Sequence, residues 1–164
     1  PISTRDAMLT PMDFRDRRHA GELLKPLVAG AIDELELDIG IGLSNPLMVV
    51  KSPSGVAVAA ALEEGLRLAS VEVPDAAAVA VVLGAMALED RTMILVDDGV
   101  ETGRTAASIA AELRAEGARR VWLAVPVCSR QSEAALSGRI DLILAVARPL
   151  GRRSLHWHYE TLDD

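Results

Sequence analysis

The segment ILVDDGVETGRT, residues 94–105, decides the fold. Its first residues continue an apolar run, 93–96, that predicts a buried strand, and the turn at 97–103 leads into an Ala-rich helix predicted over 105–116. A strand that ends in polar residues just before a helix is the repeating unit of parallel α/β sheets. In such sheets ligands bind beyond the carboxyl ends of the strands, so we expect a ligand site at residues 96–105.

The same order of strand, loop and helix occurs elsewhere in the chain. It is predicted at 47–50, 51–55 and 56–68, and the second half adds a strand at 120–127, a short helix at 129–137 and a strand at 140–145. We therefore expect an α/β fold with a mostly parallel central sheet and helices on both faces. A length of 164 residues predicts a single domain over 1–164.

Three segments are harder to interpret. Residues 12–31 have helical periodicity, with Asp13 as N-cap and Pro26 as a kink or an early end, and 33–45 has the composition of a connection. After a short strand at 71–73, residues 76–88 fit either a helix or two short strands around a glycine.

Composition excludes several classes of function. The formal net charge of −7 argues against a nucleic-acid partner, because phosphate-backbone affinity comes mainly from Lys and Arg. Cys128 is the one cysteine, so an intramolecular disulfide is impossible and a reducing compartment is favoured. We find no apolar run long enough for a membrane span and no targeting signal, and expect a cytoplasmic protein without a membrane partner.

The loop after the second predicted strand has the chemistry of a sugar-phosphate site. Amides at a helix N-terminus and the hydroxyls of Thr102 and Thr105 suit a phosphate, and Gly103 allows close approach. Asp97 and Asp98 suit two ribose hydroxyls or a hydrated Mg²⁺. The alternative is that the acids merely end a strand and Thr102 caps the helix, but the unbroken order of these features favours a functional loop.

Two other phosphate motifs are excluded. No Gly-Lys-Ser/Thr follows the acid pair, so the loop is not a Walker A loop, and Gly40-Ile41-Gly42 lacks the third glycine of a dinucleotide-binding fingerprint.

The block at 94–105 resembles the phosphoribosyl-pyrophosphate motif of type I phosphoribosyltransferases, in which two acids precede a Thr-Gly-x-Thr loop. The segments FRDRRHAG (14–21), VWLAVPV (121–127) and HWHYE (156–160) resemble a bacterial branch of the same family. The resemblance covers most of the chain with a gap in the middle. It implies the type I fold with a small C-terminal hood.

The resemblance also implies roles for the loop residues. Residues 102–105 would bind the 5-phosphate, and the acid pair would bind the ribose hydroxyls and the metal. Glu101 would be the general acid or base near the nucleobase, although a solvated loop glutamate is an equal alternative. The expected ribose and phosphate site comprises Asp97, Asp98, Gly99, Val100, Thr102, Gly103, Arg104 and Thr105.

The loop at 51–55 falls where these relatives bind the pyrophosphate. Its candidate residues are Lys51, Ser52, Ser54 and Gly55, and an ordinary exposed lysine is an equal alternative for Lys51. The loop departs from the Pro-Arg-Gly-Gly sequence of many members of the branch.

Other residues carry weaker indications. Trp157 and Tyr159 suit stacking on a base, but packing of the C-terminus is the favoured interpretation. The three histidines, His19, His156 and His158, lack convincing metal-ligand spacing, and Cys128 is interpreted as an inert thiol.

Two functions remain open at this point. The resemblance implies a transferase that uses Mg²⁺, phosphoribosyl pyrophosphate and a base, and that is often a homodimer, for which residues 76–88 suit a buried contact. The alternative is a non-catalytic module that senses phosphoribosyl pyrophosphate or a nucleotide. It is favoured by the interval 69–92, which is short and, unlike a closing lid, has no Lys or Arg before Arg91.

Overall fold

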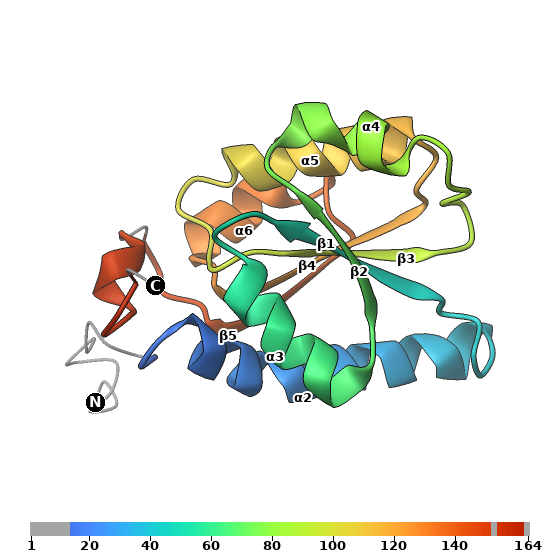
Figure 1. Cartoon of the computed structure of the whole chain (residues 1–164). Coiled ribbons are helices and arrows are strands. Elements are labelled where there is room, and N and C mark those ends of the chain that lie inside the picture. Colours follow the sequence, from blue (N-terminus) through green and yellow to red (C-terminus); the bar gives the residue numbers. More distant parts are fainter. Residues whose placement is uncertain (1–13, 152–153, 163–164) are drawn as a thin grey trace.

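The computed structural model describes residues 14–151 and 154–162. Its centre is a five-stranded sheet of order β2-β1-β3-β4-β5 in which every neighbouring pair is parallel (Figure 1). The strands are β1 (Pro46–Lys51), β2 (Ala69–Val73), β3 (Thr92–Val96), β4 (Arg120–Val127) and β5 (Leu142–Ala147).

Helices cover both faces of this sheet. Figure 1 shows α2 and α3 on one face and α4, α5 and α6 on the other. The helices are α2 (Arg17–Ile39), α3 (Val56–Leu66), α4 (Val79–Leu83), α5 (Arg104–Ala115) and α6 (Arg130–Leu136), with short 3₁₀ helices η1 (Ala76–Ala78) and η2 (Leu155–Trp157). The predicted α/β class with a parallel sheet is confirmed.

The central strand β3 explains why the sequence shows apolar runs rather than alternation. All five of its residues are buried. Met93 and Leu95 join the core cluster beneath α4 and α5, whereas Ile94 and Val96 join the cluster beneath α2 and α3. Because both faces are covered, every position of the strand must be apolar or hydrogen-bonded.

The first helix differs from its prediction at both ends. The predicted start at Met12 and the cap Asp13 lie outside the described residues. Within them the helix starts at Arg17, with Asp16 as the N-cap accepting the His19 amide, and it continues through Pro26 to Ile39. The expected connection at 33–45 was therefore wrong over its first half.

The reason for the longer helix is burial. Ile32 and Leu35 continue the helical spacing and pack against the core beneath α2 and α3, although acidic residues surround them. The helix ends at Ile39, and the amide of the C-cap residue Gly40 donates to the Glu36 carbonyl.

Residues 76–83 are helical and residues 84–88 contain no strand, so the alternative with two strands was wrong. The helical part forms η1 and α4, the C-cap of α4 is Gly84, and Val79 and Leu83 are buried in the core shared with α5. Three boundaries also move slightly: α3 ends before Arg67, which has a left-handed backbone, β2 begins at Ala69, and β5 begins at Leu142.

The two ends of the described chain meet beside the sheet. Residues 154–162, here called the hood, lie next to the start of α2 (Figure 1). The Phe14 amide donates to the His158 carbonyl at 2.9 Å, and the Glu160 amide donates to the Phe14 carbonyl at 2.8 Å. Phe14 and Tyr159 are buried together with Val127 from the end of β4. This pairing holds the hood near the carboxyl ends of the strands.

Among the described helices, none combines the length and the apolar character that crossing a membrane requires.

Candidate functional site

A cleft of about 440 Å³ opens where the strand order reverses, between β1 and β3. The loops after these two strands diverge there, which is the usual ligand position in an open parallel sheet. Lining residues from the two loops include Lys51, Ser54, Asp97, Asp98, Gly99, Val100, Glu101, Thr102, Gly103 and Thr105. The predicted acid-pair loop therefore lies in the cleft.

Asp97 joins the two loops. Its Oδ1 accepts a hydrogen bond from the Ser54 hydroxyl at 2.6 Å and one from the Asp98 amide at 2.8 Å. Burial raises the pKa of the Asp97 carboxyl to about 7, against the hydrogen bond from Ser54, which lowers it. The charge of Asp98 raises this pKa further. Asp97 is thus poised to change protonation near neutral pH.

Asp98 is held from both ends of the chain. The Nε of Arg17, at the start of α2, donates to its Oδ2 at 3.0 Å, and the Asp98 side chain is only 5% exposed. The Tyr159 hydroxyl donates to the Asp98 carbonyl at 2.7 Å. Burial raises the pKa of the Asp98 carboxyl, while Arg17 opposes this shift.

The turn into α5 leaves backbone donors available. Gly103 has φ of +87°, a left-handed conformation that suits glycine, and directly precedes the helix. The Arg104 amide donates to the Thr102 hydroxyl at 3.3 Å, but the N-cap residue of α5 is Gly103 and not Thr102, as the capping alternative would require. The amides of Thr102, Gly103 and Thr105 make no hydrogen bond within the described residues. The turn can therefore accept an anion at the positive end of α5.

Glu101 connects the turn to the hood. Its carboxylate Oε1 accepts the Leu155 amide at 3.1 Å, and its carbonyl accepts the Ser132 hydroxyl at 3.1 Å. The side chain lines the cleft and the residue is exposed. Glu101 is therefore an exposed residue whose carboxylate is hydrogen-bonded, which differs from a purely solvated loop glutamate.

Several polar groups of the loop at 51–55 form hydrogen bonds within the loop or with the neighbouring strand β2. The Ser52–Pro53 peptide bond is cis. Lys51 lines the cleft, but its Nζ donates to the Ser52 carbonyl at 3.1 Å. The Ser52 amide bonds the Val73 carbonyl, and the Gly55 amide bonds the Lys51 carbonyl. Only Lys51 and Ser54 of the four predicted pyrophosphate ligands line the cleft.

Gly55 is required by close packing. A Cβ at this position would lie 2.5 Å from the Val96 carbonyl oxygen and 3.1 Å from the Asp97 Cα. The first loop is therefore seated directly against the backbone that carries the acid pair.

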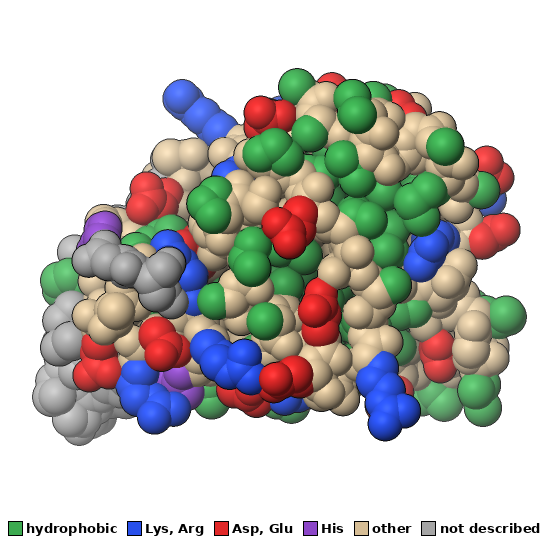
Figure 2. Space-filling view, in the orientation of Figure 1, with side chains coloured by type: hydrophobic (Ala, Val, Ile, Leu, Met, Phe, Trp, Pro, Cys, Tyr) green, Lys and Arg blue, Asp and Glu red, His purple; other side chains and the backbone are tan. Residues whose placement is uncertain are grey.

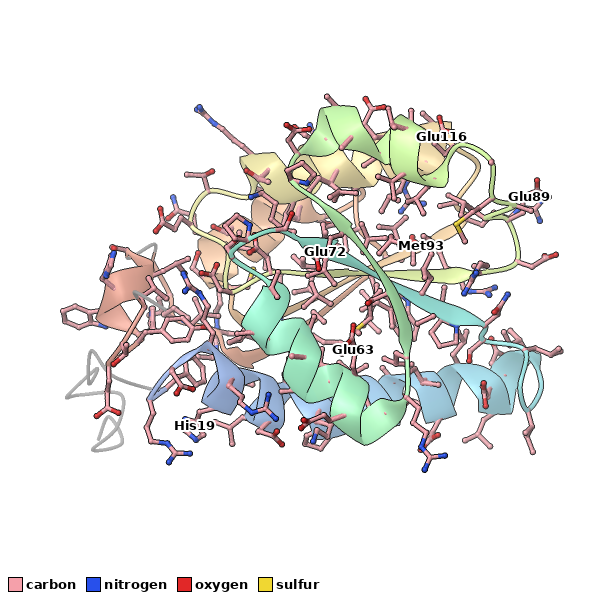
Figure 3. All side chains as sticks on the ribbon, viewed as in Figure 1. His19, Glu63, Glu72, Glu89, Met93 and Glu116 are labelled. Carbon is pink, nitrogen blue, oxygen red and sulfur yellow. The ribbon has the colours of Figure 1, made fainter. Side chains whose placement is uncertain are left out.

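Several other predicted residues lie outside the cleft. Arg104 and Trp157 are not among the lining residues, and Tyr159 is buried with its hydroxyl bonded to the acid-pair loop. Because the Tyr159 ring packs against Phe14, the favoured interpretation, packing of the C-terminus, describes it better than stacking on a base. His19 projects from the first turn of α2 (Figure 3), where its Nδ1 accepts the Arg15 amide.

Sequence reasoning missed eight lining residues, among them Arg17, Leu155 and His156. The segment 14–21 was singled out for its resemblance, but no sequence spacing indicated that Arg17 reaches the acid pair. Cys128 is buried, and burial raises the pKa of its thiol, which agrees with an inert cysteine.

Residues 69–92 contribute nothing to the cleft lining. They form β2, η1 and α4, and Val73, Val79 and Leu83 of these elements are buried in the core. Within the described residues, this interval is a packed connection and not a segment that hangs over the site.

The acid pair fits a metal ion only with help from a ligand. Groups of three or more His, Cys, Asp or Glu side chains suited to a metal are absent from residues 14–151 and 154–162. Oxygens of Asp97 and Asp98 already accept hydrogen bonds from Ser54 and Arg17. Mg²⁺ is often bound by one or two carboxylates with substrate phosphates and water, and this donor set matches that arrangement.

The surface in Figure 2 carries acidic and basic side chains interspersed, with hydrophobic groups between them. On the face shown, basic groups do not gather into a single patch.

Comparison with known proteins adds a short sequence match. No protein-family model matches the chain. Two proteins from strains of Mycobacterium tuberculosis, provisionally named phosphoribosyl transferases, are 39% identical to it over 62 residues. The match covers 38% of this chain and 14% of each relative, so the chain accounts for a small part of their length.

Similar solved structures cover much more of the chain. The protein TT1426 of Thermus thermophilus has a TM-score of 0.67 at 24% identity, covering 92% of this chain and 91% of that one. The hypoxanthine-guanine phosphoribosyltransferase of Schistosoma mansoni, solved with IMP, has a TM-score of 0.56 at 14% identity, covering 80% and 66%. The purine phosphoribosyltransferase of Pyrococcus horikoshii has a TM-score of 0.51 at 15% identity, covering 83% and 89%.

These similarities define the class. The chain has the α/β fold of the type I phosphoribosyltransferases, and the resemblance found in its sequence is confirmed.

Proposed function

We propose that the cleft binds phosphoribosyl pyrophosphate with Mg²⁺, and that the protein transfers the phosphoribosyl group to a nitrogenous base. One observation carries the proposal: the acid pair and the unbonded amides of the turn into α5 line the same cleft, at the switch point of the sheet. One loop thus carries both carboxylates for the ribose hydroxyls and backbone amides that can donate hydrogen bonds to a phosphate. A 5-phosphorylated ribose requires both kinds of group.

Each group of the cleft has a role in this proposal. The amides and hydroxyls of residues 102–105 bind the 5-phosphate, and Asp97 and Asp98 accept hydrogen bonds from the ribose hydroxyls. Lys51 and Ser54 face the leaving diphosphate. Bound Mg²⁺ would neutralise charge on the diphosphate and would be held by diphosphate oxygens, water and the acid pair.

The chemical step is a substitution at the anomeric carbon. The bond from this carbon to the diphosphate oxygen breaks, and the diphosphate leaves with the electron pair. A ring nitrogen of the base forms the new bond and loses its proton. In this proposal the Glu101 carboxylate takes that proton, and its position in the cleft lining beside the hood supports the role.

A diphosphate-release assay tests this proposal. The protein is incubated with phosphoribosyl pyrophosphate, Mg²⁺ and one base at a time from a panel of purines and pyrimidines. Release that depends on a base, and that falls by about a hundredfold or more in Asp97→Asn, is the expected result.

The alternative outcome is equally clear. Tight binding of phosphoribosyl pyrophosphate without base-dependent release from any acceptor would contradict transfer and leave a binding module.

A further inference from the structure

We propose that Arg17 is a positioning residue of the cleft: its guanidinium is the resident counter-cation of the acid pair and ties the Asp98 carboxylate to the hood. This inference takes its site from the proposed function but can be tested without a sugar-phosphate ligand.

The contacts of Arg17 reach two parts of the chain that are distant in sequence. Its Nε donates to Asp98 Oδ2 at 3.0 Å, across 81 positions, and its Nη1 donates to the Leu162 carbonyl at 2.6 Å. The Arg17 side chain is 15% exposed and lines the cleft. One guanidinium thus joins the start of α2, the acid-pair loop and the end of the hood.

The geometry of a guanidinium suits this role. Its N–H groups form a rigid planar fork, so Nε and Nη1 can serve two acceptors at once. A lysine ammonium keeps the charge but presents it at a single point on a flexible chain. The charge and the bridging function of Arg17 can therefore be separated by substitution.

Charge balance at the acid pair gives the second argument. Asp97 and Asp98 are adjacent and largely buried. The side chain that donates a hydrogen bond to the Asp97 carboxylate is the neutral hydroxyl of Ser54. Lys51 also lines the cleft, but its ammonium bonds the carbonyl of its own loop. Arg17 therefore supplies the positive charge in direct contact with a carboxylate of the pair, at a place where a divalent cation would otherwise be attracted.

It follows that the ligand-free protein should bind a divalent cation poorly, and that the metal should enter with the diphosphate. Removing the guanidinium charge leaves two carboxylates without their counter-cation. A metal should then bind directly, without any ligand.

Mn²⁺ titration followed by electron paramagnetic resonance tests the inference on ligand-free protein. We expect Arg17→Gln to bind Mn²⁺ about tenfold or more tightly than the unsubstituted protein, and Arg17→Lys to stay within about threefold of it. Arg18→Gln is the matched control, because Arg18 is exposed and pairs with Glu64. Equal Mn²⁺ affinity in Arg17→Gln and the unsubstituted protein would overturn the inference.

A second measurement applies if Arg17→Gln is too unstable to titrate. The double substitution Arg17→Gln with Asp98→Asn removes both partners of the Arg17–Asp98 pair, so neither is left facing the other's empty place, and it should recover most of the lost thermal stability. Failure to recover any would show that Arg17 does not act through Asp98.

The proposed function fails separately. Absence of phosphoribosyl pyrophosphate binding by the unsubstituted protein would contradict that function, while the Mn²⁺ comparison would still report on Arg17.

Discussion

The Ser54 hydroxyl donates to the Asp97 carboxylate at 2.6 Å, so the loop after β1 and the loop after β3 meet at a charged hydrogen bond. Residues 43 positions apart are thereby fixed on the two sides of the switch point. The relationship makes the first loop a support for the acid pair as well as a wall of the cleft.

Ser54→Ala should weaken the fold modestly. It removes the donor to a carboxylate, which costs about 1 kcal/mol of unfolding free energy, and the loss should be larger at about pH 8 than at about pH 5 because the hydrogen bond favours ionised Asp97. Urea denaturation at both pH values measures the effect. Ser70→Ala, which removes an exposed hydroxyl bonded to Glu63, is the control and should change stability little.

The raised pKa of Asp97 predicts a pH dependence of stability. Its pKa is about 7 in the folded protein and 3.8 as the ordinary value, so the folded state binds the proton more tightly than the unfolded state. The stability contributed by this proton is fully present below pH 3.8 and is lost as pH rises towards 7, by up to about 1.4 kcal/mol per pH unit.

Asp97→Asn should flatten this dependence. Urea denaturation between about pH 4 and about pH 8 should show the difference in unfolding free energy between Asp97→Asn and the unsubstituted protein shifting in favour of the variant as pH rises. A parallel dependence in both proteins would contradict the assignment of the titration to Asp97.

Replacing Asp97 or Asp98 with Asn should affect the stability of the fold differently. Asp98→Asn removes the carboxylate that pairs with the Arg17 guanidinium in a largely buried place, which should cost about 3 kcal/mol. Asp97→Asn has no such consequence, because its side-chain partner is the neutral Ser54 hydroxyl. Thermal denaturation at neutral pH compares the two variants, and equal melting temperatures would contradict the role of the Arg17–Asp98 pair.

The sequence predicted the strand, loop and helix blocks well, because their signals are local. The apolar run of β3 and the turn into α5 follow one another in the chain, and their position in the cleft follows from the parallel topology. The extent of α2 was missed because acidic residues after Ala31 indicated a connection, whereas Ile32 and Leu35 still reach the core.

The contacts that hold the acid pair in place could not be predicted, because they join residues that are far apart in the sequence. Arg17 and Tyr159 contact Asp98 from the two ends of the chain, and their partners follow from the tertiary fold rather than from spacing in the sequence. The internal hydrogen bonds of the loop at 51–55 are likewise a property of its folded backbone.

Gly55→Ala should damage the site through sterics alone. The added Cβ would lie 2.5 Å and 2.9 Å from two carbonyl oxygens, those of Val96 and Lys51, and neither backbone can move without shifting the acid pair. We expect a loss of about 2 kcal/mol or more in unfolding free energy.

Gly30→Ala is the matched control for this substitution. Gly30 lies within α2, and its Cβ would meet no atom within 4 Å, so the change should raise stability by about 0.5–1 kcal/mol. Chemical denaturation of both variants checks the contrast, which would be contradicted if Gly55→Ala were as stable as Gly30→Ala.

Calorimetric titration with phosphoribosyl pyrophosphate, with and without Mg²⁺, tests the central claim most directly. We expect Mg²⁺ to strengthen binding by about tenfold or more in the unsubstituted protein, and Asp97→Asn to weaken it by about tenfold or more. Undetectable binding under both conditions, or binding unchanged in Asp97→Asn, would contradict the claim that this cleft binds a phosphoribosyl group.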